Sequence, residues 1–354
     1  VDSIVTTVGK APADNLQIMA LVDGEATIAT EVPKRDLDGT DGFDQLISTH
    51  YLFIRKLEKV AGARLKDFAP AENACATSDT YVLGEILEDA GSIHGYDPIV
   101  HYKVANTGTL DQYVFRWGTR PMRYLKKDYA FPVVAKTDFN ARLGATYRRR
   151  SASPKLIVKG LTLLDGALDL AGEYVPGKST LVICSEVLAT LKFVAGIVNS
   201  RFASFYVKQK YASASYNGGV NFTPDMLDSI PIPAGIDQER IIKHVEIVTA
   251  AQEKRMAITS KLHGLIRASV GDKKLGRKLD AWQNLTAKQF VDELARQGLP
   301  LSITQRGEWI DIFDQHKALI GKTLTECADS ERAIDDLLFD AFSLNEAERD
   351  YILA

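Results

Sequence analysis

The chain has 354 residues, of which 45% are hydrophobic and 25% charged, with a formal net charge of −3 at pH 7. These values are typical of a globular protein with two or three domains, and no apolar run reaches the roughly 18 residues that a membrane-spanning helix needs. The three cysteines, Cys75, Cys184 and Cys327, lie far apart with no CxxC pair. Their spacing disfavours a disulfide framework or a zinc site and fits a reducing cytoplasm. No signal-peptide pattern opens the chain, and because it begins with Val1 we expect a part of a longer cytoplasmic protein without membrane contact.

The small net charge hides an uneven distribution. Residues 116–159 hold twelve Lys or Arg against two Asp or Glu. Such a local excess of positive charge suits a polyanion such as nucleic acid. From residue 321 to the end, nine acidic residues outnumber three basic ones. The alternative to a binding face is a solvated loop in which the basic residues cluster by chance.

The first third of the chain has mixed secondary-structure signals. Residues 1–45 are punctuated by Gly, Pro and Asp and contain three short strand patterns: Ser3–Val8, Gln17–Val22 and Ala26–Val32. We expect them to form a β-rich leader or the end of a preceding domain. Apolar periodicity predicts a helix over Phe43–Val60, while Asp79–Glu88 is compatible with a strand or a helix. His101–Ala105 and Tyr113–Phe115 alternate as strands do, which predicts a hairpin between them.

The remaining elements divide into a β-rich stretch and a helical stretch. Strands are predicted at Leu156–Val158 and Thr180–Cys184, and a helix at Val187–Val198. Further helices are predicted at Gln238–Ile266, Phe290–Gln297 (after a capping box at Thr286–Gln289), Glu308–Ile320, Ser330–Phe342 and from Asn345–Glu348 onward. The predicted fold class is therefore α+β. A β-rich lobe over residues 46–235 precedes an all-helical C-terminal module over residues 236–354.

Two basic clusters carry the expectation of DNA binding. Residues 116–129 read RWGTRPMRYLKKDY, and residues 147–150 read YRRR. Guanidinium groups suit bidentate contacts with phosphate or guanine, and rings between them can pack on sugars or stack on a base. The residues expected to contact DNA are Arg116, Arg120, Arg123, Tyr124, Lys126, Lys127, Arg148, Arg149, Arg150, Lys155, Lys178, Lys208, Lys210 and Asn217. Asn217 lies in a Gly-containing loop, where it is a candidate base reader or simply a turn former.

Gly172–Ser179 reads GEYVPGKS and matches the P-loop pattern GxxxxGK[ST]. That motif needs a strand before it and a helix after it, so that amide groups at the helix N-terminus face the phosphates. Here the β-branched segment Thr180–Cys184 follows, and Pro176 removes one amide. A nucleotide-binding protein that uses Gly172–Ser179 is therefore kept as an alternative. A protein-interaction scaffold built on the helical tail is a second alternative.

The patterns of several catalytic and cofactor sites are missing from the sequence. There is no HExxH, no GxSxG, no convincing PD…(D/E)xK nuclease centre, and neither an FxGxG loop nor an NPPY or DPPY tetrapeptide. The last two would be needed to bind S-adenosylmethionine and to hold a flipped adenine. We therefore expect no catalytic, cofactor-binding or metal-ligating residues in this chain and expect that the chain alone is not an enzyme.

Several segments in a fixed order carry a resemblance to a known family. They are Pro154–Gly160 (PKLIVKG), Leu168–Gly172 (LDLAG), Ile197–Arg201 (IVNSR) with Phe205-Tyr206, and Ile230–Pro233 (IPIP). In the tail, Glu308-Trp309, Phe313 and the segment from Ile334 to Glu348 add to the set. Together these segments resemble the TaqI-like C-terminal specificity domain of adenine-N6 DNA methyltransferases and type IIG restriction–modification enzymes.

The resemblance covers about residues 45–354 and implies a function for the chain. It implies that the β-rich lobe over residues 46–235 is a DNA target-recognition domain, which grips double-stranded DNA opposite a methyltransferase domain upstream in the same polypeptide. The β-rich residues 1–45 would then be the end of that methyltransferase domain. S-adenosylmethionine would be the cofactor of that parent enzyme, and the methyl transfer would belong to the upstream domain. The parent would serve bacterial defence by restriction and modification in the cytoplasm.

Overall fold

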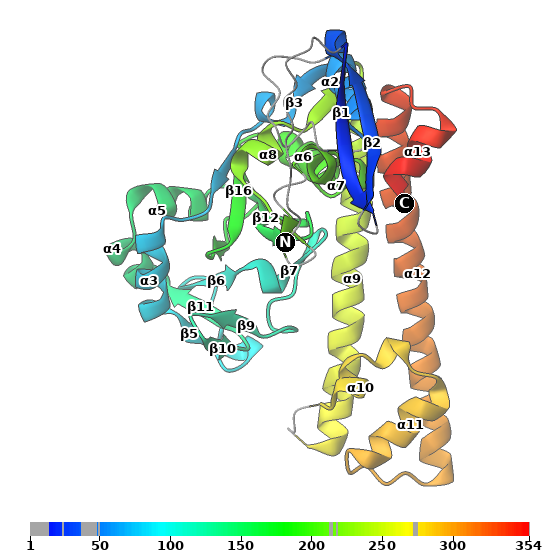
Figure 1. Cartoon of the computed structure of the whole chain (residues 1–354). Helices are drawn as coiled ribbons and strands as arrows, with labels where there is room; N and C mark the ends of the chain where they lie inside the picture. The colour runs from blue at the N-terminus through cyan, green and yellow to red at the C-terminus, as the bar shows by residue number, and fades with distance from the viewer. Residues whose placement is uncertain are drawn as a thin grey trace.

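The computed structural model describes residues 14–22, 25–36, 48, 50–211, 215–216, 219–271 and 275–353. A part that mixes strands and helices comes first, and from α9 (Gln238–Val270) onward the regular elements among the described residues are all helices. Figure 1 shows α9 beside α12 (Ile303–Ala341) as two long helices, with the sheets next to one end of the pair. The predicted class, α+β with a β-rich lobe followed by an all-helical module, is confirmed.

A four-stranded antiparallel sheet forms the centre of the β-rich lobe. Its strands, in spatial order, are β14 (Gly166–Asp169), β12 (Lys155–Lys159), β16 (Thr180–Cys184) and β4 (Ala71–Asn73). All five residues of β12 are buried, as the β-branched residues of a central strand require. Helices α6 (Leu188–Val198) and α7 (Arg201–Lys210) share one hydrophobic core with this sheet and α9. The predicted strands over 156–158 and 180–184 and the predicted helix over 187–198 are confirmed.

A second four-stranded sheet has its own core, which includes Val104, Val134 and Phe139. Its strands, in spatial order, are β15 (Tyr174–Pro176), β6 (His101–Ala105), β11 (Pro132–Ala135) and β5 (Glu88–Asp89). The helices of this region are α3 (Thr77–Ile86), α4 (Lys136–Arg142) and α5 (Ala145–Ala152). The ambiguous segment 79–88 is thus mainly helical.

The predicted hairpin between residues 101–105 and 113–115 is wrong. β6 pairs with β11 and β15, whereas β8 (Val114–Phe115) pairs with β7 (Leu110–Asp111). Two residues, Gln112 and Tyr113, connect β7 to β8, and Tyr113 has a φ of 62°. The tight local turn therefore pairs β8 with its immediate neighbour.

Several shorter elements surround the two sheets. The strand sets are β1 (Asn15–Val22) with β2 (Glu25–Pro33), β3 (Ala61–Arg64) with β19 (Pro231–Pro233), β9 (Met122–Tyr124) with β10 (Lys127–Tyr129), and β13 (Leu161–Thr162) with β18 (Gly219–Asn221) and β17 (Ser215–Tyr216). The short helices are η1 (Lys34–Asp36), α2 (Tyr51–Val60), η2 (Leu65–Asp67), η3 (Ile93–Gly95), η4 (Thr107–Thr109) and α8 (Pro224–Asp228). The strand patterns at 17–22 and 26–32 fall in β1 and β2, and the helix predicted over 43–60 is observed from Tyr51. The predicted strand Ser3–Val8 and residues 43–47 lie outside the described residues.

The helical module has a separate core around Trp282, Phe290 and Phe313. Its remaining elements are α10 (Arg277–Asp280), η6 (Trp282–Asn284), α11 (Ala287–Arg296) and α13 (Glu346–Leu353). The capping box is confirmed: the Thr286 amide donates to Gln289 Oε1 at 2.9 Å and the Gln289 amide to Thr286 Oγ1 at 3.3 Å. Among the described helices, none is long and apolar enough to cross a membrane.

The division of residues 308–342 into two helices is wrong, because α12 runs without a break from Ile303 to Ala341 and Phe342 is its C-cap. Thr323 and Cys327 lie between the two predicted helices and are buried. Cys327 Sγ lies 4.0 Å from the Val248 carbonyl oxygen of α9. The face of α12 that packs against α9 therefore continues through the middle of α12. Gly321 does not break the helix, because one glycine lowers helix stability by only about 1 kcal/mol relative to alanine.

Candidate nucleic-acid interface

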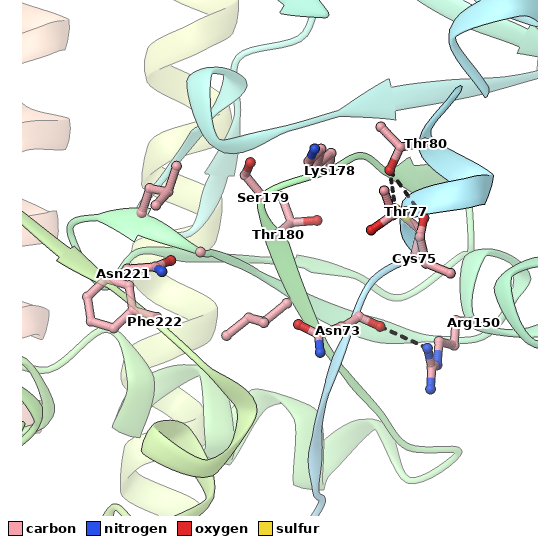
Figure 2. Close-up of a pocket in the computed structure, with 14 residues that line it drawn as sticks. Asn73, Cys75, Thr77, Thr80, Arg150, Lys178, Ser179, Thr180, Asn221 and Phe222 are labelled. Atoms are coloured by element: carbon pink, nitrogen blue, oxygen red, sulfur yellow. Dashed lines mark hydrogen bonds between the residues drawn. The ribbon is translucent and has the colours of Figure 1, made fainter. Parts of the chain in front are cut away.

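An open cleft of about 630 Å³ lies where the central sheet meets the β13–β18 pair. Residues from β4, α3, α5, β13, β16, β18 and the loop before β16 line it. We call it the Lys178 cleft and show it in Figure 2. Its lining residues are Asn73, Cys75, Ala76, Thr77, Thr80, Arg150, Gly160, Leu161, Lys178, Ser179, Thr180, Leu181, Asn221 and Phe222.

The lining carries positive charge without a carboxylate. Lys178 and Arg150 are its two cations, and no Asp or Glu is among the lining residues that the structure describes. The hydroxyl groups of Thr77, Thr80 and Ser179 add further polar groups. A cleft with this composition suits an anion that accepts several hydrogen bonds, such as a phosphodiester.

Arg150 is held in place by its neighbours. Its guanidinium forms a bidentate ion pair with the Glu72 carboxylate: Nε donates to Oε2 at 3.0 Å and Nη2 donates to Oε1. Its Nη1 donates to the Asn73 carbonyl at 2.8 Å. Arg150 therefore contributes a fixed, partly neutralised charge, and Lys178 is an exposed cation that forms no ion pair with any described residue.

A constrained turn presents Lys178. Ser179 has a φ of 68°, a backbone conformation that costs an L-residue roughly 1–2 kcal/mol. Its carbonyl accepts hydrogen bonds from the Gly160 amide at 2.8 Å and from the Thr107 hydroxyl. A Cβ on Gly160 would lie only 2.7 Å from that oxygen. The turn therefore depends on Gly160, which has no Cβ and can bring its backbone amide within hydrogen-bonding distance of the Ser179 carbonyl.

The P-loop arrangement is not formed at Gly172–Ser179. β15 (Tyr174–Pro176) lies inside the motif, and strand β16 follows it where a phosphate-binding loop needs a helix N-terminus. The nucleotide-binding alternative therefore lacks the geometry on which it depends. Of the motif residues Gly172–Ser179, all of which the structure describes, only Lys178 and Ser179 line the cleft.

Three residues expected to contact DNA are buried, and these predictions are wrong. Tyr124 is 4% exposed and its hydroxyl donates to the Thr80 carbonyl at 3.1 Å. Lys155 is 0% exposed and forms a 2.5 Å ion pair with Asp169 inside the sheet. Lys210 is 5% exposed and lies 2.6 Å from Glu58. Their polar atoms are used within the fold.

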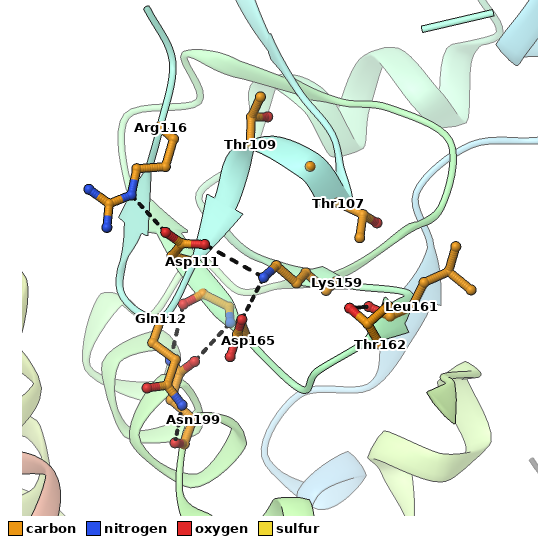
Figure 3. A network of polar contacts seen from close by, with 12 residues as sticks. Thr107, Thr109, Asp111, Gln112, Arg116, Lys159, Leu161, Thr162, Asp165 and Asn199 are labelled. Atoms are coloured by element: carbon orange, nitrogen blue, oxygen red, sulfur yellow. Dashed lines mark hydrogen bonds and ion pairs between the residues drawn. The ribbon is translucent and has the colours of Figure 1, made fainter. Parts of the chain in front are cut away.

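Arg116 and Arg120 converge on one carboxylate. Arg116 Nε lies 2.7 Å from Asp111, and Arg120 donates to both oxygens of Asp111 at 3.1 Å. Lys159 Nζ lies 3.6 Å from the same carboxylate and 2.6 Å from Asp165 (Figure 3). Burial acts to raise the pKa of Asp111, but the hydrogen bonds from the two arginines outweigh it and hold that pKa below its usual value. Both arginines are thus drawn toward Asp111, and only Arg120 remains largely exposed.

The hairpin formed by β9 and β10 presents Arg123, Lys126 and Lys127 to solvent. Its turn residues, Leu125 and Lys126, have φ values of 43° and 72°, the left-handed pair that a two-residue hairpin uses. The Arg123 carbonyl accepts a hydrogen bond from Asn106 Nδ2 at 2.9 Å. Gly177, which precedes Lys178, is also fixed, because its amide donates a hydrogen bond to the Ala105 carbonyl at 2.7 Å. The hairpin is therefore anchored beside the loop that carries Lys178.

The remaining predicted contacts are divided between several places. Arg149 is exposed on α5 next to Arg150, whereas Arg148 donates to the Asn140 carbonyl at 2.9 Å. Lys208 is exposed on α7, outside the cleft lining. Asn217 lies outside the described residues. In the part of the chain that the structure describes, the exposed cations without an ion pair include Arg123, Lys126, Lys127, Arg149, Lys178 and Lys208.

Sequence reasoning missed the two asparagines of the cleft, Asn73 and Asn221. They are separated by almost 150 positions in the sequence, and neither lies in a basic or aromatic cluster. The sheet pairing brings them together, since Asn73 lies opposite Leu181 and Asn221 opposite Leu161, and both leucines line the cleft. No short-range sequence signal would have identified them.

A second cavity of about 610 Å³ lies between the β-rich lobe and α9. Four carboxylates line it, including Glu246 and Glu253 of α9, together with two lysines and the stacked rings of Phe115 and Tyr174. Its acidic residues make it a poor site for a polyanion. The Lys178 cleft is therefore the better candidate for a nucleic-acid interface.

Comparison with known proteins gives limited information. A family model described as a domain of unknown function (DUF8810) matches residues 235–338. The match spans α9 to most of α12 and does not include the Lys178 cleft. No curated protein matches the chain.

Proposed function

We propose that this chain recognises specific sequences in double-stranded DNA as part of an adenine-N6 DNA methyltransferase or a fused type IIG restriction–modification enzyme. The observation that carries the proposal is the Lys178 cleft, which has two cations and no carboxylate among its lining residues that are described. Arg123, Lys126 and Lys127 extend the positive surface beyond the cleft on the anchored hairpin. Phosphate contacts from such cations supply affinity and set the register on the duplex.

The resemblance to TaqI-like specificity domains supports the identity of the parent enzyme. Three of the segments that carry it belong to the β-rich lobe: residues 154–160 contain β12, residues 197–201 join α6 to α7, and residues 230–233 contain β19. In this proposal the β-rich lobe positions the DNA. An upstream methyltransferase domain would supply the S-adenosylmethionine site and the methyl transfer.

A direct test uses the full chain and a pool of randomised DNA duplexes at about 150 mM salt, near physiological ionic strength. Retained DNA is sequenced after several rounds of binding. The proposal predicts enrichment of a single motif that contains an adenine. Loss of all binding at this salt concentration would contradict the proposal and favour the protein-interaction scaffold. Retention without any enriched motif would contradict sequence recognition and leave a basic surface alone.

A further inference from the structure

Two side-chain amides lie in the Lys178 cleft. Asn73 is the last residue of β4, Asn221 is the last residue of β18, and both are exposed. Among the described residues, neither side-chain amide has a hydrogen-bond partner. An asparagine amide offers two donor hydrogens and one acceptor oxygen, so both groups are available to a ligand in the cleft.

The backbone that carries Asn221 is held firmly. Asn221 pairs with Leu161 across the β13–β18 ladder, and the next amide, that of Phe222, donates to the Gly160 carbonyl at 2.8 Å. Phe222 is 5% exposed and anchors the segment in the main core. Figure 2 shows Asn221 across the cleft from Arg150, with its amide directed toward Thr180. The side chain therefore starts from a rigid frame, which is what precise base recognition requires.

Few other groups in this cleft can distinguish one base from another. Arginine and lysine read guanine, but Arg150 is already paired with Glu72 and with the Asn73 carbonyl, and Lys178 is assigned here to a phosphate. Serine and threonine hydroxyls contact several bases and therefore discriminate weakly. Carboxylates accept from the amino group of cytosine, and the described cleft lining has none. The asparagine amide, which matches the N6 and N7 positions of adenine, remains the best fitted group. Asn73 stands beside the bound guanidinium of Arg150, whereas Asn221 does not.

We propose that Asn221 reads the major-groove edge of an adenine base. Its Oδ1 would accept from the N6 amino group and its Nδ2 would donate to N7, while Lys178 contacts a nearby phosphate. This inference rests on the proposed DNA-binding function and names the specificity-determining residue of the same site.

The test compares the wild-type chain with Asn221→Ala in selection from randomised duplexes at about 150 mM salt. We expect Asn221→Ala to lose its preference for adenine at one position of the selected motif and to keep the preferences elsewhere. The discrimination at that position should fall by about 5- to 150-fold, the range of one bidentate base contact. Asn284→Ala is the matched control, because Asn284 is an exposed asparagine on η6 in the helical module.

A second measurement changes the DNA base and compares both proteins. The wild-type chain is titrated with its selected duplex and with the same duplex carrying 7-deazaadenine at the adenine in question, which lacks the N7 acceptor. We expect weaker binding of the modified duplex by wild type and no further loss in Asn221→Ala. Equal binding of both duplexes by wild type, or an unchanged adenine preference in Asn221→Ala, would overturn this inference and leave the proposed function standing. If the wild-type chain selects no motif, both proposals fail.

Discussion

The side-chain amide of Asn199 forms a two-sided hydrogen-bonded pair with the backbone of Gly166. Its Oδ1 accepts from the Gly166 amide at 2.8 Å, and its Nδ2 donates to the Gly166 carbonyl at 3.1 Å (Figure 3). The side chain is 4% exposed and sits at the C-terminal end of α6. The Asn199 amide therefore links α6 to strand β14 through the same kind of paired hydrogen bonds that a neighbouring strand would form.

Replacing Asn199 tests this structural role. Asn199→Leu removes the acceptor of the buried Gly166 amide, whereas the Gly166 carbonyl keeps the hydrogen bond from the Tyr113 amide at 2.8 Å. One unsatisfied buried group costs about 1–3 kcal/mol, so we expect the free energy of unfolding to fall by roughly that amount, measured by urea denaturation. A loss smaller than about 0.5 kcal/mol, the range of ordinary surface substitutions, would show that the pair does not stabilise the fold.

A substitution of Lys155 tests whether this side chain stabilises the fold or contacts DNA. It is fully buried, donates to Asp169 at 2.5 Å and to the Ser151 carbonyl at 2.6 Å. Burial lowers the pKa of Lys155, and the neighbouring carboxylate only partly offsets this effect. Lys155→Ala should destabilise the chain by about 3–5 kcal/mol, because it leaves Asp169 charged and buried. Under conditions where the variant remains folded, its DNA affinity should match wild type, and a selective loss of affinity without loss of stability would contradict the assignment.

Asp335 predicts a pH dependence of stability. Burial raises its pKa to about 6, and the hydrogen bond from the Arg201 amide offsets this effect only in part. The folded state holds the Asp335 proton more tightly than the unfolded state does. The free energy of unfolding is therefore highest below about pH 4, where Asp335 is protonated in both states, and it falls as the pH rises through about 6. The shift corresponds to a change on the order of 2 kcal/mol between pH 4 and pH 7.

The comparison of wild type with Asp335→Asn isolates this effect, since Asn keeps an acceptor for the Arg201 amide. Unfolding free energies are measured by urea denaturation at pH 4.5 and pH 7. The variant should gain stability relative to wild type as the pH rises. An equal difference between the two proteins at both pH values would argue against a raised pKa.

Gly160 connects the fold to the Lys178 cleft. A Cβ at this position would lie 2.7 Å from the Ser179 carbonyl oxygen, so Gly160→Ala must displace the turn that presents Lys178. We expect a loss of about 1–3 kcal/mol in stability together with weaker DNA binding. Gly264→Ala is the control, because a Cβ there meets no atom within 4 Å. Unchanged DNA affinity in Gly160→Ala would show that the position of this turn does not matter for binding.

The sequence predicted regular elements better than pairing between them. Periodicity identified β16, α6 and α9 because each buries one continuous apolar face or run. It failed where residues distant in the sequence determine which strands pair. β6, for example, pairs with β11 and β15 and not with β8, which follows it more closely in the chain. Weak local signals also failed in the middle of α12, where contact with α9 maintains the helix.

The candidate site was only partly predictable for the same reason. Lys178 was identified from a motif whose geometry the structure does not form. Positive charge alone did not distinguish the exposed Arg149 from the buried Lys155, because burial depends on the position of Asp169 in a neighbouring strand. Asn221 carries no local signal, and only the pairing of β13 with β18 brings it to the cleft.

Salt dependence of DNA affinity tests the central claim most directly. The full chain is titrated with a fixed duplex at several salt concentrations, and the slope of log affinity against log salt is compared among wild type, Lys178→Ala, Arg149→Ala and Lys208→Ala. Arg149 is used alone because Arg148 and Arg150 bond to the fold. If the Lys178 cleft and the exposed cation next to Arg150 on α5 hold the DNA, Lys178→Ala and Arg149→Ala each reduce the slope by about 1, whereas Lys208→Ala, on α7 outside the cleft, leaves it unchanged. Equal slopes for all four proteins would contradict DNA binding at this cleft.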